Sequence, residues 1–455
     1  MEEKKEKIVQ RIVEEGYQIS PEALEYLSSV ENQLLDTYLN NILTAAKEKE
    51  DLLVITLQFI KDLFEVKKEV KVSVESIPAK IEIISSPSTQ ISLRITKDIL
   101  MNYFRDKYQK LKRILEQRYT YQTIENILQK ETPGETVKLI GMIFEKKENN
   151  DLKFVVEDET GIISIKISRK NLKLFNEARR YMSDQVIFIE GILDKDRTIK
   201  VKKLDLPDVH PIHEPKRTEI DIYAAFISDL HIGHSEFQEK QFKEFVNWLK
   251  TKGREKVKYL LIAGDLINNP KEEENYNTLY TYLIEIPKSI EIIMIPGEND
   301  ATLPMLPQPP ITKNVEKLVE MPNVKILGNP ALVKIHNISI LMFHGLYMEK
   351  LAEEINAKNP LELAKFLLKS RHLCPCYGSI PIIPHPGDLL AISIVPDIFH
   401  LGHFHSTLHG EYQGVHIISS GTWIASKEKK SGPLPHSQVP IVNLKTFEME
   451  FLKFY

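Results

Sequence analysis

The stretch YAAFISDLH, residues 223–231, is a short apolar run that ends in polar positions, which include Asp229 and His231. The same arrangement returns in YLLIAGD, residues 259–265, where Asp265 follows the apolar run. Continuous apolar runs of this length, bounded by turn-forming residues, are typical of strands that are buried on both faces. The sequence from about residue 220 onward therefore predicts a covered sheet whose strands end in polar residues.

More apolar runs follow at residues 292–295, 338–343, 398–401 and 415–418. They alternate with helical stretches, and this alternation predicts a layered α/β sheet. Carboxylate, amide or imidazole side chains end these runs in the segments SDLH (228–231), GDL (264–266), PGEND (296–300), HG (344–345) and GHFH (402–405). Because ligands collect beyond the carboxyl ends of strands in α/β sheets, we expect the five segments to converge on one spot.

The side chains of the five segments have the chemistry of a metal site. Each segment alone is a weak signal, since a lone Asp-x-His or His-Gly is usually a polar loop. Their order, their place at strand ends, and their mixture of His, Asp and Asn without a thiolate favour divalent cations such as Mn²⁺, Fe²⁺, Zn²⁺ or Mg²⁺. We therefore favour metal or phosphate chemistry over structural loops.

The succession of motifs resembles the calcineurin-like metallophosphoesterases, whose pattern is Asp-x-His, Gly-Asp, Gly-Asn-His-Asp/Glu, His and Gly-His-x-His. The resemblance implies a four-layer αββα domain over residues 218–455 and two divalent cations, with Mn²⁺ favoured, that clamp a phosphodiester and activate a water. It assigns one cation to Asp229, His231 and His405, the other to His344 and His403, and a bridging position to Asp265. Because a ligating His must be neutral, activity is expected to fall in acid.

The third segment departs from the family pattern at Glu298 and Asn299, where the family has Asn and then His. Glu298 keeps a carboxylate that could bind the second cation. Asn299 stands where the family's His binds the phosphate or protonates the leaving group, and an amide cannot donate a proton in that way. Loss of a general acid typically costs about 10²–10⁴-fold in rate. An active nuclease and a weakly active or inactive metal-binding subunit both stay open.

Upstream of residue 218 the sequence predicts further segments. Residues 1–68 have apolar positions at helical spacing and a helix start at Ser20-Pro21, and predict a helical N-terminal module. Residues 69–93 mix β-branched residues with Ser and Pro and predict a linker or an irregular extended segment. Residues 94–132 predict a basic helical connector with a helix from about Thr96 to Arg118. Its cations are either solvated or in contact with nucleic acid or an acidic partner.

Residues 133–208 predict a small β-barrel, because five short runs of period two, with glycines at the bends, follow Pro133-Gly134. The segment resembles the OB-fold domains of polymerase accessory subunits, in which a turn like EDETG (157–161) precedes a strand. OB-folds often bind single strands through aromatic platforms. The aromatic residues here are few, and we expect the core to absorb Phe144, Phe154 and Phe188. A protein-docking barrel is therefore favoured over a strand-binding one.

The order of these parts resembles the small subunit of archaeal family-D DNA polymerases, which are related to the accessory subunits of eukaryotic replicative polymerases. Residues 296–309 and the stretch RHLCPCYG (371–378) resemble both branches. The retained Asp and His residues favour the archaeal branch, since burying so many ionisable groups is costly without a cation. The resemblance implies 3′→5′ exonuclease proofreading on the single-stranded 3′ end of DNA, a heterodimer with a large catalytic polymerase subunit, and contacts with other replication factors. The barrel and the N-terminal module disfavour a stand-alone phosphatase or nuclease.

The composition restricts the remaining alternatives. A chain of 455 residues is too long for one core and predicts two or three domains. Its net charge of −4 gives no global attraction for nucleic acid, so such a partner would need local basic faces. The two cysteines, Cys374 and Cys376, predict neither a disulfide nor a zinc site. No apolar run is long enough to span a membrane, and a cytoplasmic location is expected.

Overall fold

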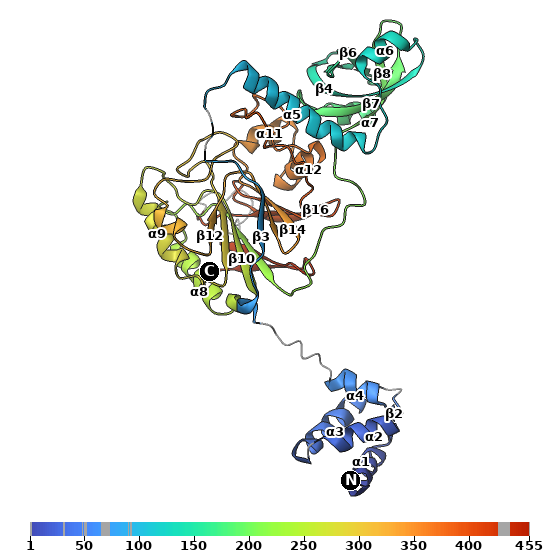
Figure 1. Ribbon diagram of the computed structural model, residues 1–455, viewed down its shortest axis with the longest axis vertical. Coiled ribbons are helices and arrows are strands. Elements are labelled where there is room, and N and C mark those ends of the chain that lie inside the picture. Colours follow the sequence, from blue (N-terminus) through green and yellow to red (C-terminus); the bar gives the residue numbers. More distant parts are fainter. Residues whose placement is uncertain are drawn as a thin grey trace. The chain divides into compact units, whose positions relative to one another are not determined.

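The computed structural model describes residues 2–30, 32–47, 49, 52–64, 73–89, 91, 93–425 and 437–454. The chain forms two compact units, residues 1–73 and 74–455, each with hydrophobic clusters of its own (Figure 1). Within these ranges no helix has the length and apolar character that crossing a membrane requires. Residues 69–72, 90 and 92 of the expected linker lie outside the described part of the chain.

The first unit is a small helical module. Its elements are α1 (Glu2–Glu14), β1 (Gln18–Ile19), α2 (Pro21–Ser29), α3 (Asn32–Lys47), β2 (Val54–Ile55) and α4 (Leu57–Phe64). The predicted helix start is confirmed, because the Ser20 hydroxyl accepts a hydrogen bond from the Ala23 amide at 3.3 Å. The core is formed by buried side chains that include Ile8 of α1, Leu27 of α2 and Ile42 of α3. No single helix could bury its apolar face alone, so the three helices stabilise one another by packing.

A closed five-stranded barrel forms one part of the second unit (Figure 1). Around the barrel the strands are β4 (Thr136–Glu148), β5 (Leu152–Glu157), β6 (Ile162–Ile167), β8 (Ile199–Asp205) and β7 (Val186–Leu193), with α7 (Leu172–Ala178) between β6 and β7 in the chain. The predicted OB-like barrel is confirmed. Phe154 and Phe188 are buried, but the expectation for Phe144 is wrong, since its side chain is 60% exposed. The pairing of β4 with β5 shifts register between Ile143 and Glu145, and such a bulge re-aims the side chain.

Helix α5 (Lys97–Glu116), with α6 (Ile124–Lys130) after it, joins the barrel to the rest of the second unit. The Thr96 hydroxyl caps α5 by accepting a hydrogen bond from the Ile99 amide at 3.3 Å. The ammonium group of the fully buried Lys107 donates to the Pro375 carbonyl, and that of Lys110 donates to the Asp388 carbonyl at 2.6 Å. Both cations hold α5 against the chain's own loops, which neither expected alternative included. Lys107 is fully buried, and Lys110, 29% exposed, also pairs with Asp106 at 2.6 Å.

Two six-stranded sheets form the remainder of the second unit. The first has the order β12 (Val324–Ile326), β11 (Glu291–Ile295), β10 (Val257–Ala263), β9 (Tyr223–Ile227), β18 (Gln438–Asn443) and β19 (Met449–Lys453). The second has the order β16 (Thr407–Tyr412), β17 (Val415–Ser420), β15 (Ile398–Leu401), β14 (Ile338–Phe343), β13 (Ala331–Ile335) and β3 (Ile81–Ser85). All six strands expected from apolar runs are confirmed as β9, β10, β11, β14, β15 and β17.

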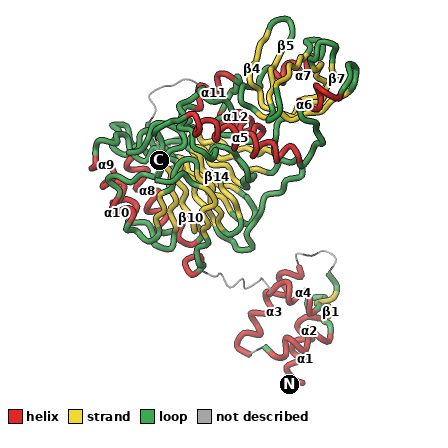
Figure 2. Tube along the Cα trace, turned by 45° about the horizontal axis from the view of Figure 1, so that its top comes forward, coloured by secondary structure: helices red, strands yellow, loops and turns green. Residues whose placement is uncertain are grey.

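The sheets pack face to face and helices cover their outer faces, so strands gather between helices in this part of the molecule (Figure 2). The outer face of the first sheet packs on α8 (Glu239–Lys250), α9 (Glu273–Leu283) and α10 (Glu316–Val319). The outer face of the second packs on α11 (Met348–Glu354) and α12 (Pro360–Ser370). Short 3-10 helices lie at η1 (Val74–Ser76) and η2 (Gly253–Glu255). This is the four-layer αββα architecture that the resemblance implies.

The prediction of a linker over residues 69–93 is wrong for residues 81–85. They form β3, which pairs antiparallel with β13 and places Ile81 opposite Ile335. An edge strand needs only one neighbour and can leave a face in solvent, as the 50% exposed Ile83 does. The resulting mixture of half-buried and exposed positions gives no clear period in the sequence, so the segment has the pattern of an irregular stretch.

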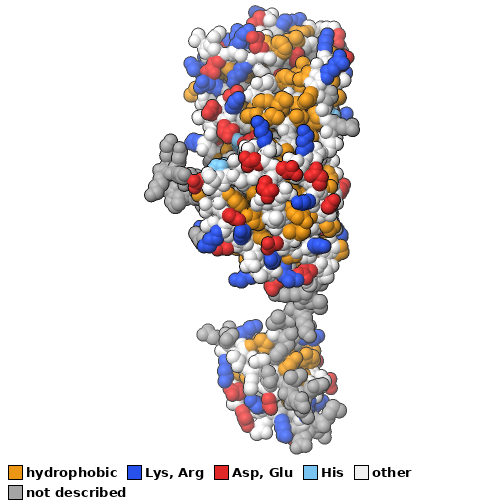
Figure 3. Space-filling view, turned by 90° about the vertical axis from the view of Figure 1, so that its left-hand side faces the viewer, with side chains coloured by type: hydrophobic (Ala, Val, Ile, Leu, Met, Phe, Trp, Pro, Cys, Tyr) orange, Lys and Arg blue, Asp and Glu red, His pale blue; other side chains and the backbone are white. Residues whose placement is uncertain are grey.

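Acidic and basic side chains are interspersed on the face of the molecule drawn in Figure 3, where no extended area of one sign is seen. This distribution agrees with the net charge of −4, which offers no long-range attraction for a polyanion. A nucleic-acid partner would therefore have to be bound by local groups of basic residues.

Candidate functional site

The candidate site lies where strands of both sheets end. Parallel strands β9, β10 and β11 end just before the SDLH, GDL and PGEND segments, and parallel strands β14 and β15 end just before the HG and GHFH segments. The carboxyl ends of parallel strands share an edge of their sheet, and the two stacked sheets bring both edges together. The structure thereby brings together all the expected site residues, which are Asp229, His231, Asp265, Glu298, Asn299, His344, His403 and His405.

The backbone of the site is strained. Five of its non-glycine residues have φ between 49° and 70°, in the left-handed region, namely Asp229, His231, Asp265, His403 and His405. Such conformations cost of order 1–3 kcal/mol each and persist only where the surrounding structure enforces them. Their concentration at the strand ends is typical of a functional site rather than of ordinary loops.

Close approach of the backbone explains two glycines of the motifs. A Cβ at Gly297 would lie 2.2 Å from Asp265 Oδ1, and one at Gly264, where φ is +85°, would lie 2.4 Å from His344 Nδ1. Neither separation is possible for real atoms, so a side chain at either position would displace a site residue. The glycines therefore allow the acidic and imidazole groups to crowd into one small volume.

The first group of donors comprises Asp229, His231 and His405, whose donor atoms all lie within 4.8 Å of one another. The two imidazoles face each other, with 3.1 Å between their Nε2 atoms. The distance from His405 Nε2 to Asp229 Oδ1 is 3.5 Å. Asp229 is fully buried, whereas the side chain of His405 is 40% exposed, so the group is open to solvent on the His405 side.

The second group comprises Glu298, His344 and His403. The two carboxylate oxygens of Glu298 contact one histidine each, His344 Nε2 at 2.6 Å and His403 Nδ1 at 2.7 Å. His344 Nδ1 lies 2.7 Å from the Ala263 carbonyl, which can only accept a hydrogen bond. In the neutral tautomer this contact leaves the Nε2 lone pair directed at the site, as a metal ligand requires.

Asp265 lies between the two groups. Its Oδ2 is 3.6 Å from His231 Nε2 and its Oδ1 is 3.6 Å from His344 Nε2. Asn299 holds the carboxylate from the other side, because its backbone amide and its side-chain amide donate to it at 2.9 and 2.7 Å. Asp265 thus lies within 3.6 Å of an imidazole of each group, and its bridging role stays a prediction.

Ionisable groups crowd together at the site and shift one another's pKa values. Burial raises the pKa of Asp265 to about 6 and lowers that of His231 to about 4. Burial opposes the charge of His403, but Glu298 and Glu349 prevail and raise its pKa to about 9. Burial likewise opposes the charge of His344, yet Asp265 and Glu298 raise its pKa well above the usual value. The carboxylates and imidazoles share protons in positions where divalent cations would bind.

The residues fit a pair of divalent cations. Three carboxylates and four imidazoles converge without a thiolate, and such donors suit hard or borderline ions. His231 Nδ1 is buried and has no hydrogen-bond partner among the described residues, so no neighbour fixes the tautomer of that ring. Mn²⁺, Fe²⁺, Zn²⁺ and Mg²⁺ all accept this kind of donor set.

Sequence reasoning missed the roles of two acidic residues near the site. Glu349, in the first turn of α11, contacts His403 Nε2 through its carboxylate. Asp300 accepts hydrogen bonds from the Gly297 amide at 2.8 Å and the Leu266 amide at 3.1 Å, and so fixes two of the loops together. Asp300 belongs to the PGEND segment, which could have drawn attention to it, whereas a single glutamate at the start of a helix gives no signal that could have identified Glu349.

Comparison with known proteins identifies the family of the chain. A family model for the B subunits of DNA polymerases alpha and epsilon matches residues 224–408, and one for the OB-fold domain of proteins like DNA polymerase epsilon subunit 2 matches residues 95–208. The DNA polymerase II small subunit of Archaeoglobus fulgidus is 31% identical to this chain, over 92% of each chain. The chain belongs to the family of DNA polymerase II small subunits.

Two further matches, one to a longer small subunit and one to a solved structure, are more limited in coverage or in similarity. The DNA polymerase II small subunit of Pyrococcus furiosus is 33% identical over 75% of this chain, and the match covers 61% of that longer protein. Among solved structures, an archaeal phosphodiesterase aligns with 51% of this chain and 100% of its own, at 13% identity and a TM-score of 0.30. That likeness is too distant to carry an argument, so membership rests on the small subunits.

The fall of stability with rising pH is expected to become weaker when metal is added. In EDTA between pH 6.5 and 9, the folded chain holds protons on His403 (pKa about 9) that the unfolded chain releases near its ordinary value of 6.5. The folded state then binds more protons, so its stability falls as the pH rises. Mn²⁺ competes with these protons, and its stabilising effect therefore grows with pH. Thermal midpoints at several pH values, in EDTA and in Mn²⁺, measure both trends; absence of any Mn²⁺ effect would contradict a metal site.

Proposed function

We propose that this small subunit is a metal-dependent 3′→5′ exonuclease that proofreads DNA and assembles with a large catalytic polymerase subunit. The observation that carries the proposal is the pair of donor groups, each with donor atoms within 4.8 Å, with Asp265 between them. Two-cation sites of this kind serve phosphodiester hydrolysis. The small-subunit family connects the site with DNA, and a nuclease attached to a polymerase is useful at the 3′ end that the polymerase extends.

Different residues of the site would bind the cations and orient their ligands. Asp229, His231 and His405 would hold one cation, Glu298, His344 and His403 the other, and Asp265 would contact both. When bound, such a pair supplies Lewis acidity to the phosphodiester and makes an attacking water more acidic. The Glu349 carboxylate, which contacts Nε2 of His403, would favour one orientation of that ring. The Ala263 carbonyl orients His344 by accepting a hydrogen bond from its Nδ1. Asn299 offers an amide that can donate a hydrogen bond but cannot release a proton.

A structural accessory subunit that binds metal but barely cleaves is the second candidate. It is supported by Asn299, which replaces the expected general acid with a group that does not titrate. It is opposed by the strained backbone and the crowded ionisable groups, which are costly to keep in a scaffold. The two candidates predict different results for the isolated chain.

The purified full chain with Mn²⁺ tests the proposal on single-stranded DNA labelled at either end. A 3′ label should be released at once as a mononucleotide, and a 5′ label should give a ladder that shortens from the 3′ end. The Asp229→Asn chain serves as the control, because it removes a ligand charge with little change in shape. Degradation no faster than in this control would leave the structural candidate, and early release of the 5′ label would exclude a 3′→5′ direction.

A further inference from the structure

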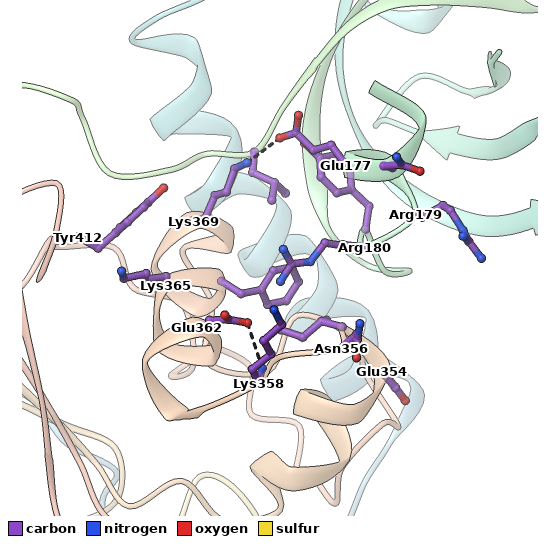
Figure 4. A pocket seen from close by; sticks show the side chains of 15 residues that line it. Glu177, Arg179, Arg180, Glu354, Asn356, Lys358, Glu362, Lys365, Lys369 and Tyr412 are labelled. Atoms are coloured by element: carbon purple, nitrogen blue, oxygen red, sulfur yellow. Dashed lines mark hydrogen bonds and ion pairs between the residues drawn. The ribbon is translucent and has the colours of Figure 1, made fainter. Parts of the chain in front are cut away.

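A cleft of about 970 Å³ lies between the barrel and the second sheet's covering helices. Its barrel side is formed by the end of α7 and the residues after it, up to Tyr181. The opposite side is formed by α12 and by the segment that connects α11 to α12 (Figure 4). The cleft is separate from the donor groups described above, since none of their residues lines it.

The walls of the cleft are rich in cations. Its basic residues are Arg179, Arg180, Lys358, Lys365 and Lys369, and its acidic residues are Glu177, Glu354 and Glu362. Arg179 pairs with Glu148 at 3.0 Å and Lys369 with Glu177 at 2.6 Å. The side chains of Arg180, Lys358 and Lys365 have no acidic partner within 4.0 Å in the part of the chain that the structure describes. Figure 4 shows Arg180 and Lys358 pointing toward each other from the two walls, whereas Lys365 projects from α12 on the side of Tyr412.

A buried polar group in the cleft wall also lacks a partner. Tyr181 is 2% exposed, and its hydroxyl has no hydrogen-bond partner among the described residues. A buried hydroxyl without a partner is unfavourable, because it has lost its hydrogen bonds to water. An anionic oxygen that entered the cleft would be attracted by the three unpaired cations, and a small adjustment of the wall would let it accept a hydrogen bond from the Tyr181 hydroxyl.

Helix α11 connects the cleft with the candidate catalytic site. Glu349, in its first turn, contacts His403, whereas Glu354, its last residue, and the following Ile355 and Asn356 line the cleft. A helix of seven residues is about 10 Å long, so the cleft and the site are only a few nucleotides apart. The walls are dominated by cations rather than by exposed aromatic rings, which suits contact with phosphates rather than stacking on bases.

We propose that this cleft binds the phosphate backbone of single-stranded DNA whose 3′ end lies in the candidate catalytic site. The inference rests on the proposed nuclease function for the identity of the ligand. Arg180 from the barrel side and Lys358 from the opposite side clamp the strand, and Lys365 adds a further cation to the lining of the cleft. Binding depends on phosphates alone and is therefore independent of base sequence.

The double variant Arg180→Ala/Lys365→Ala of the full chain tests the cleft by fluorescence anisotropy. The probe is a fluorescent oligothymidylate of about 12 nucleotides, within the range of OB-fold site sizes. Measurement in EDTA prevents cleavage and makes the result independent of metal. We expect the affinity to fall about tenfold and the slope of log K against log salt to become less steep by about 1.4, since each single-strand phosphate contact contributes about 0.7. The matched control, Lys195→Ala/Lys252→Ala, removes two exposed cations elsewhere.

Each outcome has one meaning. Affinity and slope equal to those of the control, at an unchanged thermal midpoint, would overturn the proposal. A competition experiment with polyglutamate gives a second test. If polyglutamate displaces the oligonucleotide as effectively as unlabelled DNA does, the proposal is overturned and the cleft is a docking site for an acidic protein segment. If the cleft variant loses DNA binding while the unaltered chain with Mn²⁺ cleaves nothing, the cleft stands and only the proposed nuclease function fails.

Discussion

Replacing Asp265 by asparagine is expected to lower Mn²⁺-dependent cleavage of single-stranded DNA by about 10³-fold or more. Asp265 has oxygens 3.6 Å from imidazoles of both donor groups, so the change removes one negative charge from both cation positions at once. Charge stabilisation by a two-cation site is worth several kcal/mol, and about 4 kcal/mol corresponds to a factor of about 10³. Initial rates on a 3′-labelled strand, at saturating Mn²⁺, measure the loss.

The same substitution should stabilise the metal-free chain. Burial raises the pKa of Asp265 to about 6, so its charge at neutral pH is held at a cost to the folded state, and an uncharged amide removes that cost. The thermal midpoint in EDTA should therefore rise, and its further rise on adding Mn²⁺ should shrink. The matched control is Asp221→Asn, which also removes one negative charge. Asp221 precedes β9, at the end of the strand opposite the site, so this change should alter neither the midpoint in EDTA nor its rise in Mn²⁺. A variant that kept the full Mn²⁺ response would contradict the bridging position.

Local sequence predicts the strands that carry the site because each is a continuous apolar run that must be buried on both faces. The runs before Asp229, Asp265 and His344 are of this kind, and each forms a strand within one or two residues of the expected limits. The order of the segments along the chain, and the rule that ligands collect at the carboxyl ends of strands, then predict that the polar residues converge, without knowledge of the fold. The candidate site is predictable because it depends on strand ends, which are local features.

Features that depend on contacts between distant segments are not predictable in this way. The cations of α5 have the pattern of a solvated helix face, and only the fold reveals that Lys107 is buried against Pro375, 268 residues further along the chain. Strand β3 exists because β13 offers it an edge. The cleft likewise depends on the segment after α7, with Arg180, lying opposite α12, with Lys365, and neither residue belongs to a motif.

Replacing the two residues that differ from the family pattern, by Glu298→Asn together with Asn299→His, is expected to raise the cleavage rate by about 10²-fold. Asn299 donates hydrogen bonds to Asp265 but has no proton to give at neutral pH, whereas an imidazole at this position can protonate a leaving oxygen. General-acid catalysis typically contributes about 10²–10⁴-fold. Asparagine at 298 retains an oxygen donor and matches the family's pattern, so the second donor group should keep its cation. Rates of the two chains at saturating Mn²⁺ measure the gain.

The pH profile distinguishes proton donation from a mere change in metal affinity. A general acid must be protonated, so the double variant should gain a limb on which the rate falls as the pH rises through the pKa of the new imidazole, near 6.5 when unperturbed. The original chain should lack that limb, and Asn299→Gln, which keeps an amide, should lack it as well. A double variant that is no faster than the original chain, although it binds Mn²⁺ as tightly, would mean that the site does not need a general acid at residue 299. The leaving oxygen would then be stabilised by the cations alone, and Asn299 would serve only to hold Asp265.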